Sequence, residues 1–433
     1  MKGNTRRDLF LKTEGARRIY ESCRALPIID FHNHLSVKDL SENRRFEDLF
    51  ELWLAPDPYK HRLMRISGVD EHFITGGASP REKFRKYCEI FPTLFANPVY
   101  DWSISELEWV FGIDTPISLE SADYIFDRAA EMLRSPEYRA REILSRFGVE
   151  YSSPVATERD DLSVFDGSGT SPSLRGDGLL APTKELLAML ESRSGIKIRD
   201  TGSYIKALSP LLDDFSRRGC RFADHSLDAG FFDNGESRER ELLTALAGEY
   251  RRRGWTLLLH LDAKRKTSPR LERLVGGAGG FAAVGGTLCA SALCELIADM
   301  EAGEGLPDTV LFPLNMSDQS ALAVMGGSFA EDGVRSKLQL GPAWWWCDHE
   351  YGIRSTLSAI ASSGVLSCFI GMTTDSRSIL SFVRHDYFRR ILSSFLDEES
   401  EKRGGIPFAD LEKIAYRISY ENAKLKTQKG QKI

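Results

Sequence analysis

The stretch that decides the fold is Leu26-Pro-Ile-Ile-Asp-Phe-His-Asn-His-Leu35. Its apolar run delivers His32 and His34 two residues apart, and side chains at this spacing in a strand point to the same face. Neutral imidazole is a common ligand of zinc and neighbouring divalent cations. The stretch therefore predicts a strand that ends in a metal site. A pair of solvated surface histidines is the alternative.

Short apolar runs rich in β-branched residues recur along the chain, with helical stretches between them. This alternation predicts βαβ units and a parallel sheet. Several runs end in polar side chains, as a (β/α)8 TIM barrel requires, because its chemistry lies at the carboxyl ends of the strands. An open sheet would gather its site at one switch point instead. We therefore predict an α/β protein with a (β/α)8 TIM barrel, its strands over residues 28–32, 148–153, 173–177, 221–224, 256–261, 309–314, 337–344 and 366–372.

The segment between the first and second strands is far longer than a crossover needs. It contains helical patterns such as the one that starts at Ser79 and Pro80, which suit the N-cap and first position of a helix. We predict that residues 36–145 form a helical insertion subdomain and that residues 1–35 and 146–423 form the barrel. The lysine-rich residues 424–433 are expected to be a frayed tail.

Composition excludes several function classes. The 433 residues include 57 basic and 63 acidic side chains, a net charge of −6, which argues against a nucleic-acid or anionic membrane partner. No apolar run approaches the ~18 residues of a membrane span, and no signal sequence is visible. Seven scattered cysteines lack CxxC spacing and predict no disulfide framework. We expect a cytoplasmic enzyme that acts on a small molecule; a homo-oligomer is compatible with the sequence.

Asp375 and Arg377 close the last predicted strand in Thr373-Thr-Asp-Ser-Arg377. The first and last strands of a closed barrel are neighbours, so Asp375 can join His32 and His34 around one cation. Two histidines and one carboxylate with open positions are typical of a catalytic metal site. Arg377 would then face an anion or an enolate. The alternative is a buried ion pair between Asp375 and Arg377.

Polar residues also follow two central strands. His260 ends the run Trp255-Thr-Leu-Leu-Leu-His260 and is either a core histidine or a ligand of a metal or substrate. Asp224 and His225 are substrate-binding candidates at the end of the preceding strand. Adjacent strand residues face opposite sides, so we expect only one of the two to point inward.

Three further features bear on the ligand. Trp344 and Trp345 begin a cluster of three tryptophans, of which at least one should wall the pocket and exclude water. Arg175 is either a carboxylate clamp or a surface arginine. The run Gly276-Gly-Ala-Gly-Gly280 follows a helix-like stretch and not a strand, so we expect a loop and no nucleotide cofactor.

Together these motifs resemble the uronate isomerase family, the glucuronate isomerases of the amidohydrolase superfamily. The resemblance runs along nearly the whole chain. Its most specific parts are Asp30-Phe-His-Asn-His-Leu35, Thr374-Asp-Ser-Arg-Ser378 and Arg384-His-Asp-Tyr-Phe-Arg-Arg-Ile-Leu392.

The resemblance implies a metal-assisted interconversion of D-glucuronate with D-fructuronate, or of D-galacturonate with D-tagaturonate, through an enediolate. One divalent metal, taken to be zinc, would be held by His32, His34 and Asp375, with His260 close to it. Asp375 would be the base, and Arg175 would hold the C6 carboxylate of the sugar acid. The other residues implied to line the substrate are Arg377, Tyr59 and Trp345.

Three stretches depart from the family pattern. Ser152-Ser-Pro-Val-Ala-Thr157 replaces Thr-Thr-Asp-Asp-Pro, His260-Leu-Asp-Ala263 replaces His-Ile-Gly-Ala, and Gly280-Phe-Ala-Ala283 replaces Gly-Phe-Asp-Ser. One hypothesis is an isomerase whose sugar-acid specificity has drifted. A mononuclear hydrolase on the same barrel and a non-catalytic sugar-acid binding protein are the rival functions; the three metal ligands weigh against the second.

Overall fold

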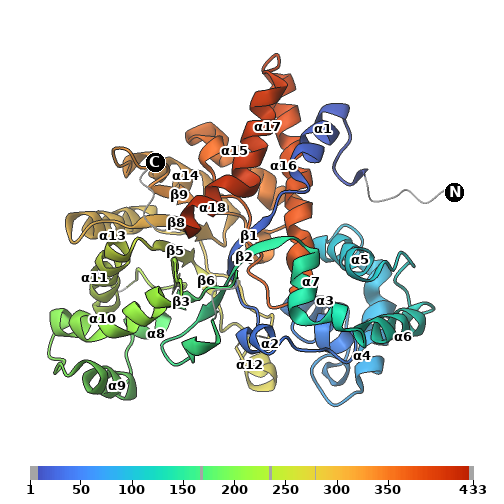
Figure 1. Cartoon of the computed structure of the whole chain (residues 1–433), viewed down its shortest axis with the longest axis horizontal. Coiled ribbons are helices and arrows are strands. Elements are labelled where there is room, and N and C mark those ends of the chain that lie inside the picture. The colour runs from blue at the N-terminus through green and yellow to red at the C-terminus, as the bar shows by residue number, and fades with distance from the viewer. Residues whose placement is uncertain (1–7, 166–168, 234–236, 278, 429–433) are drawn as a thin grey trace.

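The computed structural model describes residues 8–165, 169–233, 237–277 and 279–428. Within these residues a parallel seven-stranded sheet occupies the centre of the molecule, in the order β1-β2-β3-β4-β5-β8-β9 (Figure 1). This architecture confirms the α/β barrel class. The strands are β1 (Ile28–Asn33), β2 (Val149–Ala156), β3 (Ser173–Arg175), β4 (Phe222–Leu227), β5 (Thr256–Leu261), β8 (Asp308–Pro313) and β9 (Leu338–Leu340).

Helices surround this sheet, and their ends carry the expected signals (Figure 1). Asp200 forms a capping box at the start of α10, and Gly254 ends α11 in the left-handed conformation. Both helices bury leucine side chains, and α11 packs against β5 and α10. The helices between β3 and the end of α16, apart from the short α12, are α8 (Asp177–Leu180), α9 (Lys184–Ser194), α10 (Thr201–Arg217), α11 (Arg238–Arg253), α13 (Ala290–Ala302), α14 (Gln319–Ser328), α15 (Glu350–Ser363) and α16 (Val383–Lys402).

The predicted strand over residues 366–372 is wrong. The chain forms a short 3-10 helix, Leu366–Cys368, and then runs without regular structure through the eighth position of the barrel. It contacts β9 through a side chain, because the Ile370 amide donates to Oε1 of Gln339 at 2.9 Å. An apolar run resembles a strand in sequence, but here the segment lacks a backbone ladder to either neighbour among the described residues.

A buried carboxylate joins this eighth segment to β1. Asp30 is fully buried, and its Oδ1 accepts hydrogen bonds from the Thr373 hydroxyl at 3.0 Å and the Thr374 amide at 2.7 Å. Two backbone hydrogen bonds join the same segments, from the Asp375 amide to the His32 carbonyl at 3.2 Å and from the His34 amide to the Ser376 carbonyl at 2.8 Å. We call this set of contacts between β1 and residues 373–376 the seam. The seam therefore brings the residues after Thr373 beside the end of β1.

The chain between β1 and β2 is helical, and its helices gather beside the barrel (Figure 1). Ser79 forms a capping box with Glu82 and Pro80 opens the helix, which confirms the predicted start of α4. Lys60 donates to Asp57 at 2.5 Å and to Glu106 at 3.1 Å, and this buried network ties α3 to α5. The helices are α2 (Val37–Ser41), α3 (Pro58–Ile66), α4 (Pro80–Ile90), α5 (Pro98–Phe111), α6 (Ala122–Leu133) and α7 (Ala140–Arg146).

The two ends of the described chain are helical. At the amino-terminal end, α1 (Glu14–Cys23) packs on α16. At the other end, α17 (Phe408–Tyr416) and α18 (Asn422–Thr427) come after α16 in the sequence. α18 includes Lys424, which pairs with Glu150, so the predicted frayed tail is wrong over 424–427. Residues 429–433 of that prediction lie outside the described residues.

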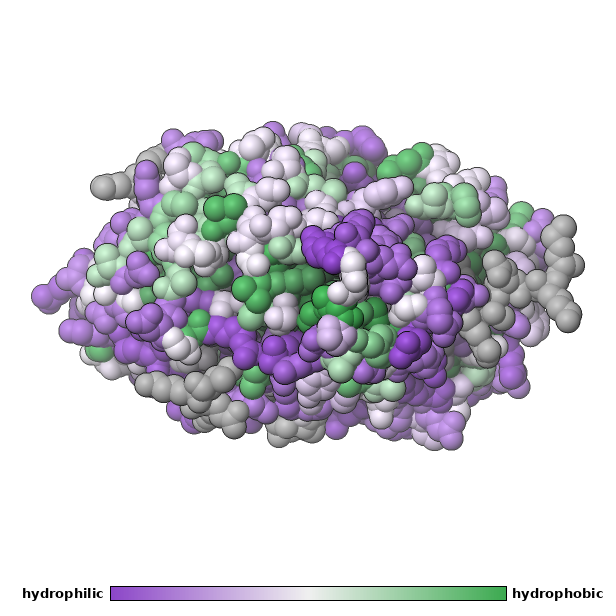
Figure 2. All heavy atoms as spheres, turned by 90° about the horizontal axis from the view of Figure 1, so that it is seen from above, coloured by the Kyte–Doolittle hydropathy of each residue, from purple (hydrophilic) through white to green (hydrophobic). Residues whose placement is uncertain are grey.

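A two-stranded hairpin and a short helix lie after β5: β6 (Ala263–Lys264), β7 (Ala283–Val284) and, between them, α12 (Pro269–Val275). Part of the glycine-rich run falls here, with Ala278 outside the described residues. Figure 2 shows a face on which hydrophilic side chains are interspersed with several small hydrophobic areas, some of them near its centre. In the described chain, every helix is too short or too polar to cross a lipid bilayer.

Candidate active site

A cavity of about 270 Å³ opens at the carboxyl ends of the strands. The strand ends, the first turn of α3 and the eighth segment all contribute side chains to it. This is the position that a TIM barrel uses for its chemistry. Its lining residues are His32, His34, Pro58, Tyr59, Arg175, His260, Arg265, Trp344, Trp345, Asp375, Ser376 and Arg377.

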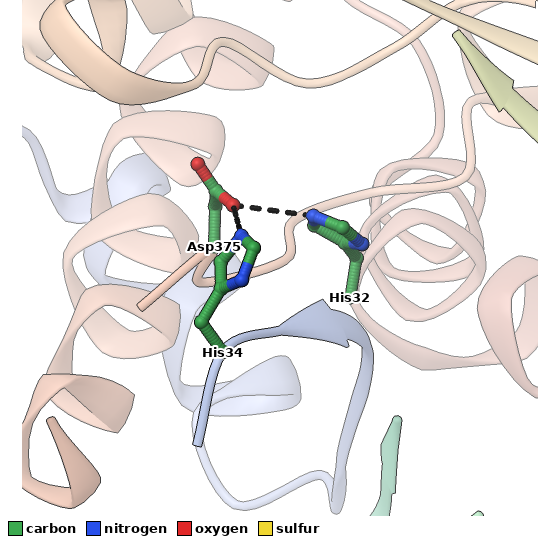
Figure 3. A group of neighbouring side chains, drawn as sticks. All are labelled: His32, His34 and Asp375. Carbon is green, nitrogen blue, oxygen red and sulfur yellow. Dashed lines mark ion pairs between the residues drawn. The ribbon is translucent and has the colours of Figure 1, made fainter. Parts of the chain in front are cut away.

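His32, His34 and Asp375 converge on one point of this cavity (Figure 3). Oδ1 of Asp375 lies 3.2 Å from Nε2 of His32 and 3.1 Å from Nε2 of His34. Asp375 has a φ of 48°, a left-handed conformation that aspartate adopts more readily than most residues. The irregular backbone of the eighth segment thus turns the carboxylate toward both rings.

The charges of this group are set by burial and by mutual contact. Burial alone would raise the pKa of Asp375, but the hydrogen bonds from His32 and His34 hold it well below its usual range. Burial also opposes the protonation of His32, yet Asp224 and Asp375 raise its pKa. Burial lowers the pKa of His34. The group therefore presents an ionised carboxylate between two imidazoles.

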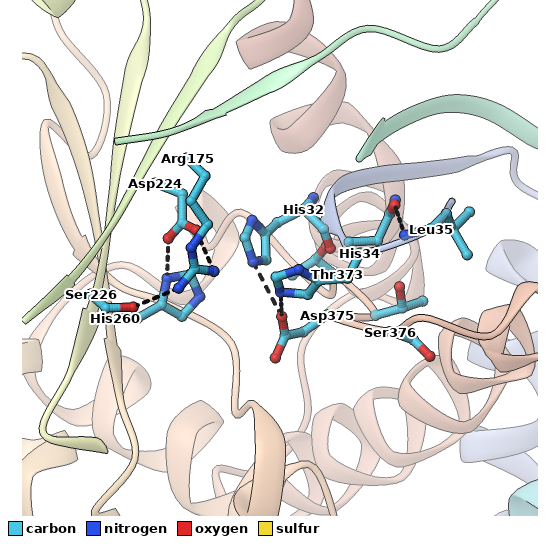
Figure 4. Close-up of polar contacts among 12 residues, drawn as sticks. His32, His34, Leu35, Arg175, Asp224, Ser226, His260, Thr373, Asp375 and Ser376 are labelled. Carbon is cyan, nitrogen blue, oxygen red and sulfur yellow. Dashed lines mark hydrogen bonds and ion pairs between the residues drawn. The ribbon is translucent and has the colours of Figure 1, made fainter. Parts of the chain in front are cut away.

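A second group faces it across the cavity (Figure 4). Oδ1 of Asp224 lies 2.5 Å from Nδ1 of His260, and its Oδ2 lies 3.1 Å from Nη1 of Arg175. Burial would raise the pKa of the fully buried Asp224, but His260 and Arg175 hold it well below its usual range. An ionised carboxylate only accepts, so Nδ1 of His260 is the donor and Nε2 carries a free lone pair.

These groups fit a metal ion. Among the described residues, two sets bring their ligand atoms within 4.8 Å of one another: His32 with His34 and Asp375, and His32 with Asp224 and His260. Nε2 of His260 and Nδ1 of His32 are buried without a hydrogen-bond partner. A carboxylate that holds the far nitrogen of a histidine is the usual support for a metal-ligating ring. Either set could therefore hold a cation.

Arginines give the cavity a positive side, and one of them was not predicted from the sequence. Arg265 is held by Asp228 through its Nε, at 3.0 and 2.9 Å, and by the Ser226 hydroxyl at 2.6 Å. The same hydroxyl accepts from Arg175 at 3.0 Å. The basic run Lys264-Arg265-Lys266 after β5 was the available signal. With Arg377, three guanidinium groups line the cavity.

Aromatic rings close the remaining sides. Trp344 lies edge-on to His260, with ring centroids 4.5 Å apart. The ring of Trp345 lies against that of Trp344, with centroids 5.5 Å apart. Tyr59 enters from the first turn of α3, where Asp57 caps the helix, and its ring meets that of Trp346 at 5.1 Å. Both predicted tryptophans and Tyr59 thus line the cavity.

His225 is not where the substrate-binding prediction put it. Its ring is fully buried, and Nε2 lies 2.9 Å from the hydroxyl of Tyr250 on α11, outside the cavity. The pleat of β4 explains the difference, because Asp224 faces the cavity and its neighbour must face the helices. Asp224 itself contacts the cavity residues Arg175 and His260 and does not line the cavity.

Comparisons with known proteins agree with this geometry. The family model described as glucuronate isomerase matches residues 1–243 and 236–425. The chain belongs to the glucuronate isomerase family. It is therefore an isomerase, an enzyme of the intramolecular oxidoreductase class.

Individual members of the glucuronate isomerase family match over nearly their full length. The chain is 35% identical to the uronate isomerase of Caldanaerobacter subterraneus subsp. tengcongensis, over 96% of this chain and 97% of that protein. It is 36% identical to the uronate isomerase of a Marinomonas species, over 98% and 99%. The crystal structure of uronate isomerase from Thermotoga maritima superposes with a TM-score of 0.88, at 25% identity over 99% of this chain and 100% of that one.

Proposed function

We propose that the protein interconverts D-glucuronate and D-fructuronate, and D-galacturonate and D-tagaturonate, with the help of a divalent metal. One observation carries the proposal: His32, His34 and Asp375 meet in a cavity that three arginines also line. The first group suits a catalytic metal, and the arginines suit a sugar that carries a carboxylate. The names of the relatives support the same substrate class.

The metal proposal rests on the donor set. His32, His34 and Asp375 would hold the cation, which we take to be zinc, and His260 would lie beside it. A bound divalent cation would stabilise negative charge on sugar oxygens without any proton transfer.

The side chains divide the remaining work. Aldose–ketose conversion removes the proton from C2 of the open-chain sugar and returns it to C1. We assign the proton transfer to Asp375, because its carboxylate lines the cavity and is ionised. Arg377 would stabilise charge on the oxygens of the enediolate. Arg175 and Arg265 would bind the C6 carboxylate, since guanidinium groups match planar anions.

The aromatic side chains protect this chemistry. Trp344, Trp345 and Tyr59 would limit the access of water, which strengthens the electrostatic interactions inside the cavity. All seven cysteines lie in the described chain as free thiols, and this suits the reducing cytoplasm in which we place the enzyme.

A coupled assay tests the proposal. The purified protein should isomerise glucuronate and galacturonate, lose this activity after chelation and regain it with zinc. Full activity on both uronates would count against a drift of specificity, and preference for another sugar acid would support one. Hydrolysis of lactones or amides without isomerisation would replace the proposal with the mononuclear hydrolase.

A further inference from the structure

A second aspartate lies directly behind the cavity. Asp348 follows the tryptophan cluster and is 3% exposed. Its Oδ2 accepts hydrogen bonds from the Tyr59 hydroxyl at 3.0 Å and from Nη1 of Arg384 at 3.2 Å. Tyr59 lines the cavity and Asp348 does not, so the carboxylate reaches the cavity only through the phenol.

The ring of Tyr59 is held on several sides. The Arg384 guanidinium lies 4.6 Å from its centroid, and the rings of Trp102 and Trp346 meet it edge-on at 5.7 and 5.1 Å. Arg384 is 1% exposed. The phenol oxygen is therefore fixed at the edge of the cavity, with its hydrogen committed to Asp348.

We propose that Asp348 is a positioning residue that makes Tyr59 a proton carrier between the two sugar oxygens. Isomerisation moves a proton from the hydroxyl on C2 to the oxygen on C1 as well as moving the proton on carbon. The C2 hydroxyl passes its proton to the phenol oxygen while the phenol proton moves to Asp348. The reverse transfers deliver one proton to the C1 oxygen and restore both side chains, so the net charge is unchanged. This inference rests on the proposed function.

The surroundings of Asp348 suit this exchange. The charged and titratable groups that act on it are Tyr59 from α3, Arg384 from α16 and, at longer range, Asp375 from the eighth segment. Asp348 in turn acts on Tyr387 of α16 and on the adjacent Cys347. Burial raises the pKa of Asp348 to about 7, although Arg384 and the Tyr59 hydroxyl act in the opposite direction. A carboxyl that titrates near neutral pH can both accept and return a proton during turnover.

The chain contains a matched control outside the cavity. The Tyr20 hydroxyl donates to Asp386 at 2.5 Å, and Nε of Arg390 donates to the same carboxylate at 2.6 Å. The Arg390 guanidinium lies 4.5 Å from the Tyr20 ring. Nη2 of Arg390 also donates to the Tyr20 hydroxyl at 2.9 Å. The residue types and the two hydrogen bonds to the carboxylate otherwise repeat those of Tyr59, Asp348 and Arg384, but the catalytic cavity is lined by none of Tyr20, Asp386 and Arg390.

The experiment compares Asp348→Asn with Asp386→Asn in the full, zinc-loaded protein. We expect Asp348→Asn to lower kcat by about 10²-fold, the low end for a proton-transfer group, with little change in KM. Asp386→Asn should leave kcat and its pH profile unchanged while lowering the melting temperature. Tyr59→Phe and the double variant Tyr59→Phe/Asp348→Asn should be equally slow. Equal kcat values for the two asparagine variants, or additive losses in the double variant, would overturn the proposal.

A spectroscopic measurement separates this inference from the proposed function, because its central observation is made on the wild-type protein and needs no catalytic activity. Fluorotyrosine is incorporated, and the ¹⁹F resonance of Tyr59 is assigned by its absence from Tyr59→Phe. We expect this resonance to titrate near pH 7 in the wild type and not in Asp348→Asn. A titrating resonance in a protein without uronate isomerase activity would leave the pairing intact and defeat the proposed function. A ¹⁹F chemical shift of Tyr59 that does not change around pH 7 would show that Tyr59 and Asp348 are not coupled, and would overturn this inference.

Discussion

The two sides of the cavity use the same residue types in different ways. The ligand wall consists of His32, His34 and Asp375 and depends on the irregular eighth segment. The strand wall consists of Arg175, Asp224 and His260 and depends on paired strands, with Arg175 opposite Asp224 and Ser226 opposite His260. In the ligand wall the Asp375 carboxylate lies between the rings of His32 and His34. In the strand wall the Asp224 carboxylate lies behind the single ring of His260.

This difference indicates that Asp375 acts on the substrate directly, whereas Asp224 positions the side chains that do. Asp375 lines the cavity, while Asp224 is fully buried and acts on the cavity only through Arg175 and His260. We therefore expect substitutions in the ligand wall to change the reaction more than matched substitutions in the strand wall.

Asp375→Asn should have the largest effect. The variant keeps the shape of the side chain but removes its charge, so kcat should fall by about 10³-fold as both a base and a metal ligand are lost. Steady-state kinetics and metal analysis of the purified variant measure this. Asp262→Asn is the control, because Asp262 also has a positive φ, 58°, yet lies outside the cavity. Similar kinetics for the two variants would contradict the assignment of Asp375.

Asp224→Asn should have a smaller effect. It would leave His260 without its ionised partner, and loss of such a support lowers metal affinity or activity by about 10- to 100-fold. Zinc titration and kcat measure the loss. His225→Gln tests the adjacent position on the same strand, whose side chain faces Tyr250, and should leave both quantities unchanged. A larger loss in His225→Gln than in Asp224→Asn would reverse our assignment of the faces of β4.

Arg175→Lys should affect binding more than the rate. Lysine keeps the charge but loses the planar fork that matches a carboxylate, so KM for glucuronate should rise about 10-fold, equivalent to about 1.4 kcal/mol. Comparison with the neutral sugar glucose isolates the carboxylate contribution. An unchanged KM would assign the carboxylate to Arg265 or Arg377.

The last prediction concerns stability and its dependence on pH. The pKa of Asp348 is about 7 in the folded protein against an ordinary value of 3.8, so between these values the folded state keeps a proton that the unfolded state releases. Its contribution to the free energy of unfolding is therefore lost as the pH rises through this window, by up to ~1.4 kcal/mol per pH unit. Urea unfolding at pH 5, 6 and 7 should show this slope in the wild type and less of it in Asp348→Asn. Parallel curves would show that Asp348 is ionised throughout.

Sequence patterns predicted the strand wall better than the ligand wall. The runs that became β4 and β5 are almost entirely buried and paired on both sides, and β5 is apolar up to His260, so local pattern and tertiary environment agree. The run over 366–372 has the same appearance, but its hydrogen bonds go to side chains such as Gln339, and no local pattern encodes that. Asp375 was still predicted correctly as a neighbour of His32, because closure of the barrel requires it.

The residues missed are those whose partners are distant in sequence. Asp348 meets Tyr59 across 289 positions, and neither has a local motif that indicates the contact. Arg265 depends on Asp228 and Ser226 at the end of β4, almost forty positions earlier in the sequence. By contrast, the start of α4 was predictable because its cap is local.

The seam between β1 and the eighth segment has a consequence for synthesis of the chain. His32 and the Thr373 hydroxyl that receives its amide hydrogen are 341 positions apart. A ribosome must therefore complete most of the polypeptide before Asp375 can meet the histidines made near the start. The nascent amino-terminal part cannot assemble the ligand wall by itself, and translation that stops short of Asp375 leaves a product without a working centre.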